Sequence, residues 1–159
     1  MVKVLLVCTG NTCRSPMAAT LLAGMAEQAG MADQIIVASA GISAWRQPAS
    51  PQAQAVMRQA GLSLDKHFSK QLVLAHLEEA DLVLAMTTAH KRALVAMLPI
   101  PVAPGMVEKI YTLAEFAGET GEVLDPFGGS EVQYYTCAQQ LQQLLTAAWG
   151  KIVKIAGKK

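Results

Sequence analysis

The chain alternates short, mostly apolar runs with longer segments in which apolar residues recur every three or four positions. The short runs predict β-strands, because strands buried on both faces are almost continuously hydrophobic. They span residues 4–7, 34–40, 81–86 and 109–113. The longer segments predict helices by their periodicity and composition. They span residues 17–29, 51–59, 70–79 and 88–97, followed by one long helix from residue 131 onward.

Strands and helices alternate along the sequence, which predicts a three-layer α/β fold. Strand–helix–strand units form right-handed crossovers and therefore a parallel sheet. We expect a four-stranded parallel sheet with the short strand 109–113 at an edge, and ligands bound beyond the carboxyl ends of the strands. With 159 residues and 52% hydrophobic content, the chain suits one domain and is short for two. We expect a single domain over residues 1–159.

Composition and charge exclude several classes of function. The formal net charge is +1 and 16% of the residues are charged, which argues against a nucleic-acid-binding protein. The first strand begins almost at residue 1, which leaves no room for a secretory signal. The most apolar long stretch, residues 93–107, is interrupted by prolines and does not suit a membrane span. We therefore expect a cytoplasmic protein that has no membrane partner.

The cysteines predict a reducing compartment. Cys8, Cys13 and Cys137 are too few and too unevenly spaced for a disulfide framework or a four-ligand zinc site, so we expect no metal. Cys8 and Cys13 lie close together in one loop, and we expect them to be able to form a reversible disulfide under oxidation. Cys137, in the last helix, is expected to be a small buried hydrophobic residue.

The most informative segment is residues 8–16, Cys-Thr-Gly-Asn-Thr-Cys-Arg-Ser-Pro, between the first strand and the first helix. Ser15 suits a helix N-cap and Pro16 the first helical position. Amide groups of the loop and of the helix start would converge on an anion, and the Arg14 guanidinium matches phosphate oxygens in pairs. The positive potential would favour the thiolate of Cys8. The segment lacks the glycine and lysine motifs of nucleotide-binding loops, so it predicts a phosphate site with its own nucleophile.

A turn sequence at residues 124–130 contains a second candidate, Asp125. A carboxylic acid placed there would protonate a leaving group and then accept a proton from water. An Asp before Pro126 is also a common turn former, and the two interpretations are compatible. Trp45 and Phe127 are candidates for the wall of the pocket, with ordinary packing as the alternative for each.

The segment 8–16, Asp125-Pro126 and the chain length together resemble the low-molecular-weight protein tyrosine phosphatase family, over essentially the whole chain. The resemblance implies a flavodoxin-like fold, no metal or other cofactor, and a cysteinyl-phosphate intermediate. It also implies that Cys8 is the nucleophile, Arg14 the phosphate-binding arginine and Asp125 the general acid. The other residues implied to bind phosphate or to support the loop are Thr9, Gly10, Asn11, Thr12, Cys13, Ser15, Ser39 and His67.

Thr12 bears on which phosphate is removed. Tyrosine-directed members usually have Ile or Leu at this position and an aromatic pair after Asp-Pro, whereas this chain has Thr12 and then Phe127-Gly-Gly. Both differences, together with segments 86–91 and 110–116, resemble the bacterial protein arginine phosphatases of the family. We therefore expect phosphoarginine in proteins as the substrate, with phosphotyrosine as the alternative.

Two other functions stay open at this point. Arsenate reduction would need a relay of thiols, and no cysteine lies between Cys13 and Cys137. A phosphocarrier would hold phosphate on Cys8 without needing Arg14 or Asp125. For partners, we expect phosphorylated proteins and no nucleic acid, and we expect a monomer or weak dimer.

Overall fold

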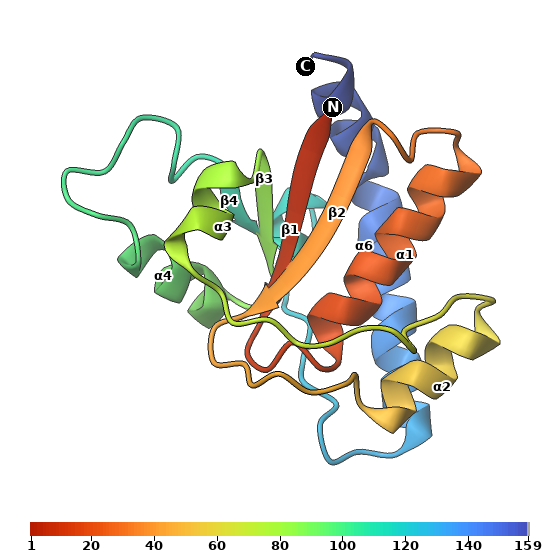
Figure 1. The fold of residues 1–159 in the computed structure, drawn as a ribbon. Helices are drawn as coiled ribbons and strands as arrows, with labels where there is room; N and C mark the ends of the chain where they lie inside the picture. The colour runs from red at the N-terminus through yellow and green to blue at the C-terminus, as the bar shows by residue number, and fades with distance from the viewer. Residues whose placement is uncertain (159) are drawn as a thin grey trace.

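Four parallel strands form one sheet in the order β2-β1-β3-β4, in a computed structural model that describes residues 1–158 (Figure 1). The strands are β1 (Val2–Cys8), β2 (Ile35–Gly41), β3 (Leu82–Ala85) and β4 (Ile110–Thr112). Every neighbouring pair is parallel. The predicted flavodoxin-like α/β architecture is therefore confirmed, with β4 at an edge and the reversal of strand order between β1 and β3.

Helices cover both faces of the sheet. Figure 1 shows α1 and α6 on one side of the strands and α3 and α4 on the other. The long helix α6 packs against both α1 and α2. The bounds are α1 (Arg14–Gln28), α2 (Pro51–Gln59), α3 (Leu74–Glu79), α4 (Thr88–Ala96), α5 (Leu113–Phe116) and α6 (Glu131–Gly157).

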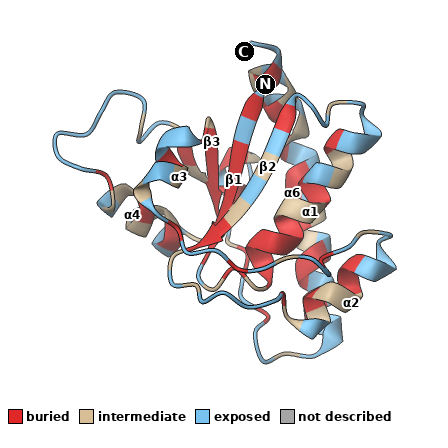
Figure 2. Ribbon diagram, in the orientation of Figure 1, coloured by how far each residue is buried: buried red, intermediate tan, exposed pale blue. Residues whose placement is uncertain are grey.

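Apart from Lys3, the central strand β1 is hydrophobic and buried because each of its faces meets a separate core. Val4 and Leu6 belong to the core that contains residues of α1 and α6. Leu5 and Val7 belong to the core that contains residues of α3 and α4. Figure 2 shows β1 and β3 mostly buried between helices whose outer faces are exposed, whereas the middle of β2 is partly exposed. Burying one such side chain contributes roughly 1.5–3 kcal/mol, so the strand that ends at Cys8 is firmly anchored.

Two predicted elements have different bounds in the structure. The helix predicted over residues 70–79 begins only at Leu74, because the preceding residues extend beside the end of β2. Gly41 N donates to Lys70 O at 2.9 Å, and Leu72 N donates to Gly41 O at 2.8 Å. The strand predicted over residues 109–113 ends at Thr112, whose hydroxyl caps α5. In both cases hydrogen bonds override the apolar pattern.

The terminal helix α6 starts where the sequence predicts. The Ser130 hydroxyl accepts from Gln133 N, and Gln133 bonds back to Ser130 N, which completes a capping box. Its buried residues, among them Leu141, Leu145 and Ile152, form one face toward the sheet. Within residues 1–158, no helix combines the length and the apolar character needed to cross a membrane.

Candidate active site

The candidate nucleophile lies where β1 meets α1. Cys8 ends the strand and Arg14 begins the helix. The first helical hydrogen bond runs from Met17 N to Cys13 O at 3.0 Å, so the amides of Arg14 and Ser15 precede the helical ladder. The predicted cap is wrong: Cys13 occupies the N-cap position without a side-chain bond, and Ser15 lies inside the helix. The Ser15 hydroxyl is instead used within the loop.

Asn11 holds the phosphate loop, residues 8–15, in shape. It is fully buried and, among the described residues, is the one non-glycine residue with a positive φ, 56°. Its Nδ2 donates to Ser15 Oγ (2.8 Å) and Ser39 Oγ (3.0 Å), while its Oδ1 accepts from Lys70 N (3.0 Å). His67 Nε2 donates to Asn11 O at 2.8 Å, which requires the proton on that nitrogen. The predicted supporting residues Ser39 and His67 thus meet at Asn11, one at its side chain and the other at its backbone oxygen.

The Ser15 hydroxyl connects Asn11 with the candidate nucleophile. Ser15 Oγ accepts from Asn11 Nδ2, so its own hydrogen is free to point toward Cys8 Sγ, 2.9 Å away. A thiolate at Cys8 is a good acceptor for that hydrogen. Cys8 and Ser15 are both buried, so this contact is shielded from water.

Gly41, at the end of β2, allows the loop to pass close to the sheet. A Cβ at this position would lie 2.5 Å from Thr9 O and 2.9 Å from Ala44 Cβ. The loop backbone continues the pairing, since Ile42 N donates to Cys8 O and Ser43 N donates to Thr9 O, both at 3.0 Å. The sequence predicts only that the strand ends at residue 40, because the close approach at Gly41 depends on sheet register.

The loop surrounds a small cleft of about 210 Å³. The sequence-predicted residues Cys8, Arg14, Asp125 and Phe127 line it, as do the turn residues between Cys8 and Arg14. Gln47 also lines the cleft, although no motif in the sequence singled it out. Trp45 is not part of the lining and is 79% exposed, so it is neither a cleft wall nor a packing residue.

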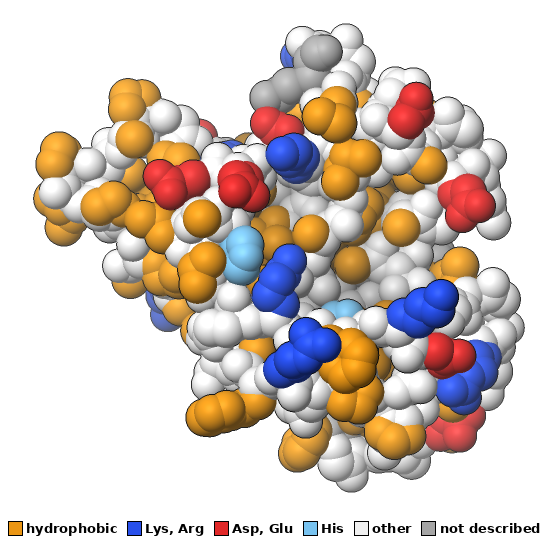
Figure 3. All heavy atoms as spheres, in the orientation of Figure 1, with side chains coloured by type: hydrophobic (Ala, Val, Ile, Leu, Met, Phe, Trp, Pro, Cys, Tyr) orange, Lys and Arg blue, Asp and Glu red, His pale blue; other side chains and the backbone are white. Residues whose placement is uncertain are grey.

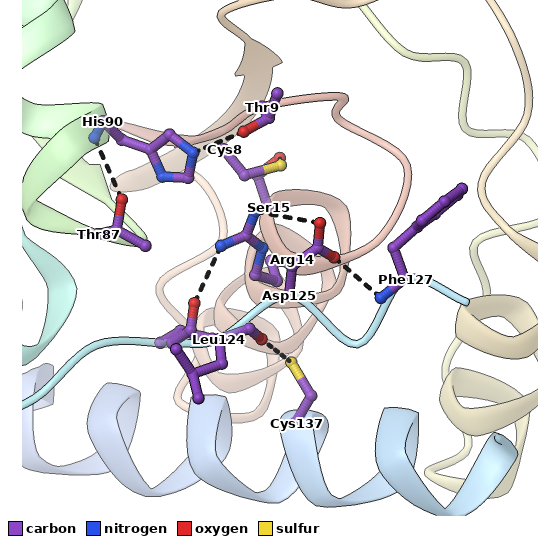
Figure 4. Close-up of polar contacts among 11 residues, drawn as sticks. Cys8, Thr9, Arg14, Ser15, Thr87, His90, Leu124, Asp125, Phe127 and Cys137 are labelled. Carbon is purple, nitrogen blue, oxygen red and sulfur yellow. Dashed lines mark hydrogen bonds and ion pairs between the residues drawn. The ribbon is translucent and has the colours of Figure 1, made fainter. Parts of the chain in front are cut away.

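Arg14 and Asp125 face each other across this cleft (Figure 4). Arg14 Nη2 lies 3.6 Å from Asp125 Oδ2, and Arg14 Nη1 donates to Val123 O at 3.0 Å. Arg14 is buried, whereas the Asp125 side chain is half exposed. Asp125 Oδ1 accepts from Phe127 N at 3.0 Å, so the turn interpretation also holds for this residue. The carboxylate therefore stands at the mouth of the cleft and the guanidinium inside it.

The three cysteines are all free thiols and all buried. Interaction with the neighbouring Cys137 thiol, followed by burial, raises the pKa of the Cys13 thiol. Cys137 Sγ also contacts Leu124 O at 4.0 Å, beside Asp125. The Cys13 thiol thus interacts with Cys137 of α6, whereas the Cys8 thiol contacts the Ser15 hydroxyl. A disulfide between Cys8 and Cys13 under oxidation stays a prediction.

His90 is a site residue that sequence analysis missed. Its Nε2 lies 2.7 Å from Thr9 Oγ1, beside Cys8 (Figure 4). It is only 8% exposed, and its Nδ1 has no hydrogen-bond partner among the described residues. His90 sits in the first turn of α4, which Thr87 caps after β3. Its position just after a predicted strand could have indicated this role. The carboxyl ends of parallel strands lie at the same edge of the sheet, so residues that follow β3 come close to the end of β1.

Burial, followed by the positive charge of Arg14, lowers the pKa of His90 below its ordinary value of 6.5, against the opposing charges of Asp125 and Glu122. Between that lowered value and 6.5, the unfolded chain binds a proton that the native protein does not. His90 therefore makes the protein lose stability as the pH falls. We expect His90→Asn to reduce this loss between about pH 7.5 and about pH 5.5, as measured by urea midpoints. Equal losses in both proteins would contradict this prediction.

The geometry supports transfer of a phosphoryl group through a covalent intermediate. A thiol at the base of an anion-binding loop attacks phosphorus in line, while amides and a guanidinium stabilise the equatorial oxygens. A carboxyl group at the mouth of the cleft is in position to exchange a proton with the leaving group. Within residues 1–158, no three or more His, Cys, Asp or Glu side chains are grouped to hold a metal ion.

Comparisons with known proteins agree with this class of site. The chain belongs to the low-molecular-weight phosphotyrosine protein phosphatase family, whose family model matches residues 3–156. It is therefore a cysteine-dependent protein phosphatase.

Among its relatives, a protein-arginine-phosphatase of Bacillus subtilis is 40% identical over 144 residues, which covers 89% of this chain and 91% of the relative. The low-molecular-weight protein-tyrosine-phosphatase PtpB of Staphylococcus haemolyticus is 34% identical, covering 90% and 94% of the two chains. A solved structure of the YwlE arginine phosphatase, a mutant with a phosphorylated active-site serine, superposes with a TM-score of 0.86 at 37% identity. That superposition covers 96% of each chain.

Proposed function

We propose that this protein removes phosphate from phosphoarginine residues of proteins, through a phosphate ester formed on Cys8. The observation that favours arginine over tyrosine is Thr12, a hydroxyl-bearing residue in the lining of the cleft. The relationship to the Bacillus subtilis protein-arginine-phosphatase supports the same assignment. The single most direct test compares steady-state rates on phosphoarginine and phosphotyrosine proteins, with Cys8→Ser as the blank.

In the first step, Cys8 Sγ attacks phosphorus, an S–P bond forms, and the bond from phosphorus to the guanidinium nitrogen breaks. Asp125 delivers its proton to that nitrogen, so arginine leaves in a stable form. Arg14 and the amides at the start of α1 stabilise the charge on the equatorial oxygens. The Ser15 hydroxyl, 2.9 Å from Sγ, supports this role because it can donate to the thiolate before the attack.

In the second step, water attacks the phosphorus of the cysteinyl phosphate and the S–P bond breaks. Asp125, now a carboxylate, accepts a proton from the water, and the Cys8 thiolate and free phosphate are the products. The half-exposed position of the Asp125 side chain supports both roles, since water must reach it between the steps. The exchange needs no cofactor, because the proton that leaves with the arginine is replaced by one taken from the attacking water.

Thr12 is the proposed determinant of the substrate. Its side chain lies in the cleft lining, and only part of it is exposed. A hydroxyl group is able to hydrogen-bond the guanidinium N–H groups of phosphoarginine or orient the attacking water, whereas a branched alkyl chain would pack on the ring of phosphotyrosine.

We expect Thr12→Ile to lower the ratio of phosphoarginine to phosphotyrosine turnover by about 10- to 200-fold, the usual effect of reshaping an apolar contact in a binding site. The measurement is kcat/KM on matched peptides that differ only in the phosphorylated residue. Thr12→Ser, which retains the hydroxyl, serves as the matched control and should keep the wild-type preference. An unchanged ratio in Thr12→Ile would remove the basis for this account of selectivity.

Phosphotyrosine is the second candidate substrate. The 34% identity to a protein-tyrosine-phosphatase supports it, and so does Phe127, which is 79% exposed at the rim where an aromatic ring of a substrate would stack. If phosphotyrosine is the substrate, Phe127→Ala should weaken its binding more than that of phosphoarginine. The kinetic comparison above separates the two assignments directly.

A further inference from the structure

A second hollow, larger than the catalytic cleft, lies behind the phosphate loop. Its volume is about 690 Å³, compared with about 210 Å³ for the cleft. We call it the α1–β2 groove. Small residues such as Ala19 and Ala23 of α1 and Ala38 of β2 form its floor. Residues from the segment 63–70 line the rest of it. Its size is that of a ligand-binding pocket.

The α1–β2 groove is cationic. Lys66, His67 and Lys70 line it, and among the described residues no Asp or Glu does. Within residues 1–158, neither lysine has a carboxylate within ion-pair distance. Asp65, next to Lys66 in the sequence, is paired with Arg58 at 3.0 Å. Figure 3 shows Lys and Arg side chains around a hollow on this face. The positive charge of the groove therefore lacks a partner within this part of the chain.

The groove and the cleft lie on either side of Asn11. Asn11 lines the cleft, while its hydrogen-bond partners Ser39, His67 and Lys70 line the groove. The strip of surface formed by segments 45–47 and 68–69 connects the groove with the cleft in a second way. Ser69 N donates to the backbone oxygen of Gln47, a cleft residue, at 2.8 Å.

A third cation lies along this strip. The Arg46 guanidinium stands 4.6 Å above the ring of Phe68, and Phe68 also lines the groove. Phe68 is 49% exposed, so its ring is accessible together with the guanidinium above it. A chain that runs from the cleft to the groove along this strip therefore passes the Arg46 guanidinium and the Phe68 ring.

A protein phosphatase must bind a chain that continues on both sides of the phosphorylated residue. A cleft of about 210 Å³ holds the phosphorylated side chain and little more, so the flanking chain has to lie on the surrounding surface. An extended chain advances about 3.3–3.6 Å per residue, so residues a few positions away meet surface well outside the cleft. Unpaired cations there attract carboxylates and disfavour basic residues.

We propose that the α1–β2 groove is a docking site for an acidic segment of the protein substrate, adjacent in sequence to the phosphorylated residue. The proposal rests on the proposed phosphatase function, in either its arginine or its tyrosine form. Carboxylates of the segment pair with Lys66 and Lys70, and its apolar side chains lie on the alanine-rich floor. The site gives the enzyme a preference among phosphoproteins that Thr12, inside the cleft, does not supply.

The test uses peptides that carry the same phosphorylated residue, flanked on one side or the other by Glu-rich, Gln-rich or Lys-rich segments. For the wild-type protein, we expect kcat/KM to be highest on a Glu-flanked peptide. In Lys66→Glu/Lys70→Glu, the Glu-to-Gln ratio should fall by about 3- to 10-fold, as for loss of two exposed ion pairs. The Lys-flanked peptide should become the better substrate. The wild-type preference should shrink in high salt, because salt screens exposed charges.

The matched control is Lys154→Glu/Lys158→Glu, which changes the net charge equally at the far end of α6 and should keep the wild-type ratio. Docking is refuted if the Glu-to-Gln ratio stays constant in the groove variant or falls as much in the control. Each rate is divided by the rate of the same variant on p-nitrophenyl phosphate. This small substrate has no flanking chain, so the division removes any effect of the substitutions on the cleft itself. Running each series with phosphoarginine and with phosphotyrosine separates failure of the docking proposal from failure of the substrate assignment.

Discussion

Replacement of Asp125 by Asn is expected to lower kcat on a phosphorylated protein by ~10²–10⁴-fold, the usual contribution of a placed general acid. Asparagine keeps the side-chain oxygen that accepts from Phe127 N at 3.0 Å, so the turn should survive. The variant loses only the exchangeable proton. With p-nitrophenyl phosphate, whose leaving group needs little protonation, the first step should persist and the second should slow. Phosphate should then accumulate on Cys8, visible as a burst of nitrophenol and as an added mass.

The matched control is Glu122→Gln, which removes another carboxylate from the same segment. Glu122 Oε1 accepts from Thr88 N at 2.7 Å and is not part of the cleft lining. The Glu122→Gln protein should therefore show no burst of nitrophenol. An Asp125→Asn protein with near-normal kcat would exclude Asp125 as acid and base. Stable phosphate on the wild-type protein, without release, would instead favour a phosphocarrier.

Replacement of Arg14 by Lys is expected to lower kcat/KM by ~10²–10³-fold, as for the loss of one preorganised donor to a developing oxyanion. Lysine keeps the positive charge but not the planar pair of donors that matches two phosphate oxygens. It also loses the geometry that now reaches Val123 O at 3.0 Å and Asp125 at 3.6 Å. Steady-state kinetics and competition by vanadate, which occupies the same site, measure the loss.

Arg58→Lys is the control for this substitution, because Arg58 is exposed and its guanidinium pairs with the surface groups Asp65 and Gln54. It should be close to wild type in rate and stability. Thermal unfolding of Arg14→Lys distinguishes a local chemical defect from a collapsed loop. A loss smaller than about tenfold in a folded Arg14→Lys protein would mean that charge alone, without the bidentate fork, accounts for phosphate binding.

The hydrogen bonds around Asn11 explain how so short a loop holds its shape. A left-handed backbone conformation is costly for a residue with a side chain. At Asn11 it is held by four hydrogen bonds, whose partners lie at the start of α1, in β2 and in the segment 67–70. The same bonds orient Ser15 toward Cys8. The support of the nucleophile is therefore distributed over three parts of the chain.

Several details depended on contacts that no local pattern encodes. The interaction of the Cys13 thiol with that of Cys137 connects the loop with α6, and the contact of Thr9 with His90 connects it with α4. Gln47, rather than Trp45, completes the cleft. These differences share one cause. Amphipathic periodicity tells which face of an element is buried, but it contains no information about which other element will cover that face.

The sequence by itself determined the α/β architecture, the strand–loop–helix unit at Cys8 to Arg14 and the start of α6, because each depends on neighbouring residues and on repeated patterns. Such features follow from residues that are close together in the chain, and they do not depend on how the strands are aligned in the sheet. Only the tertiary structure decided that Asp125 faces Arg14, that Ser39 and His67 meet Asn11, and that a cationic groove adjoins the cleft. Those contacts join residues far apart in the chain, and the parallel register of β1 with β2 and β3 brings them together.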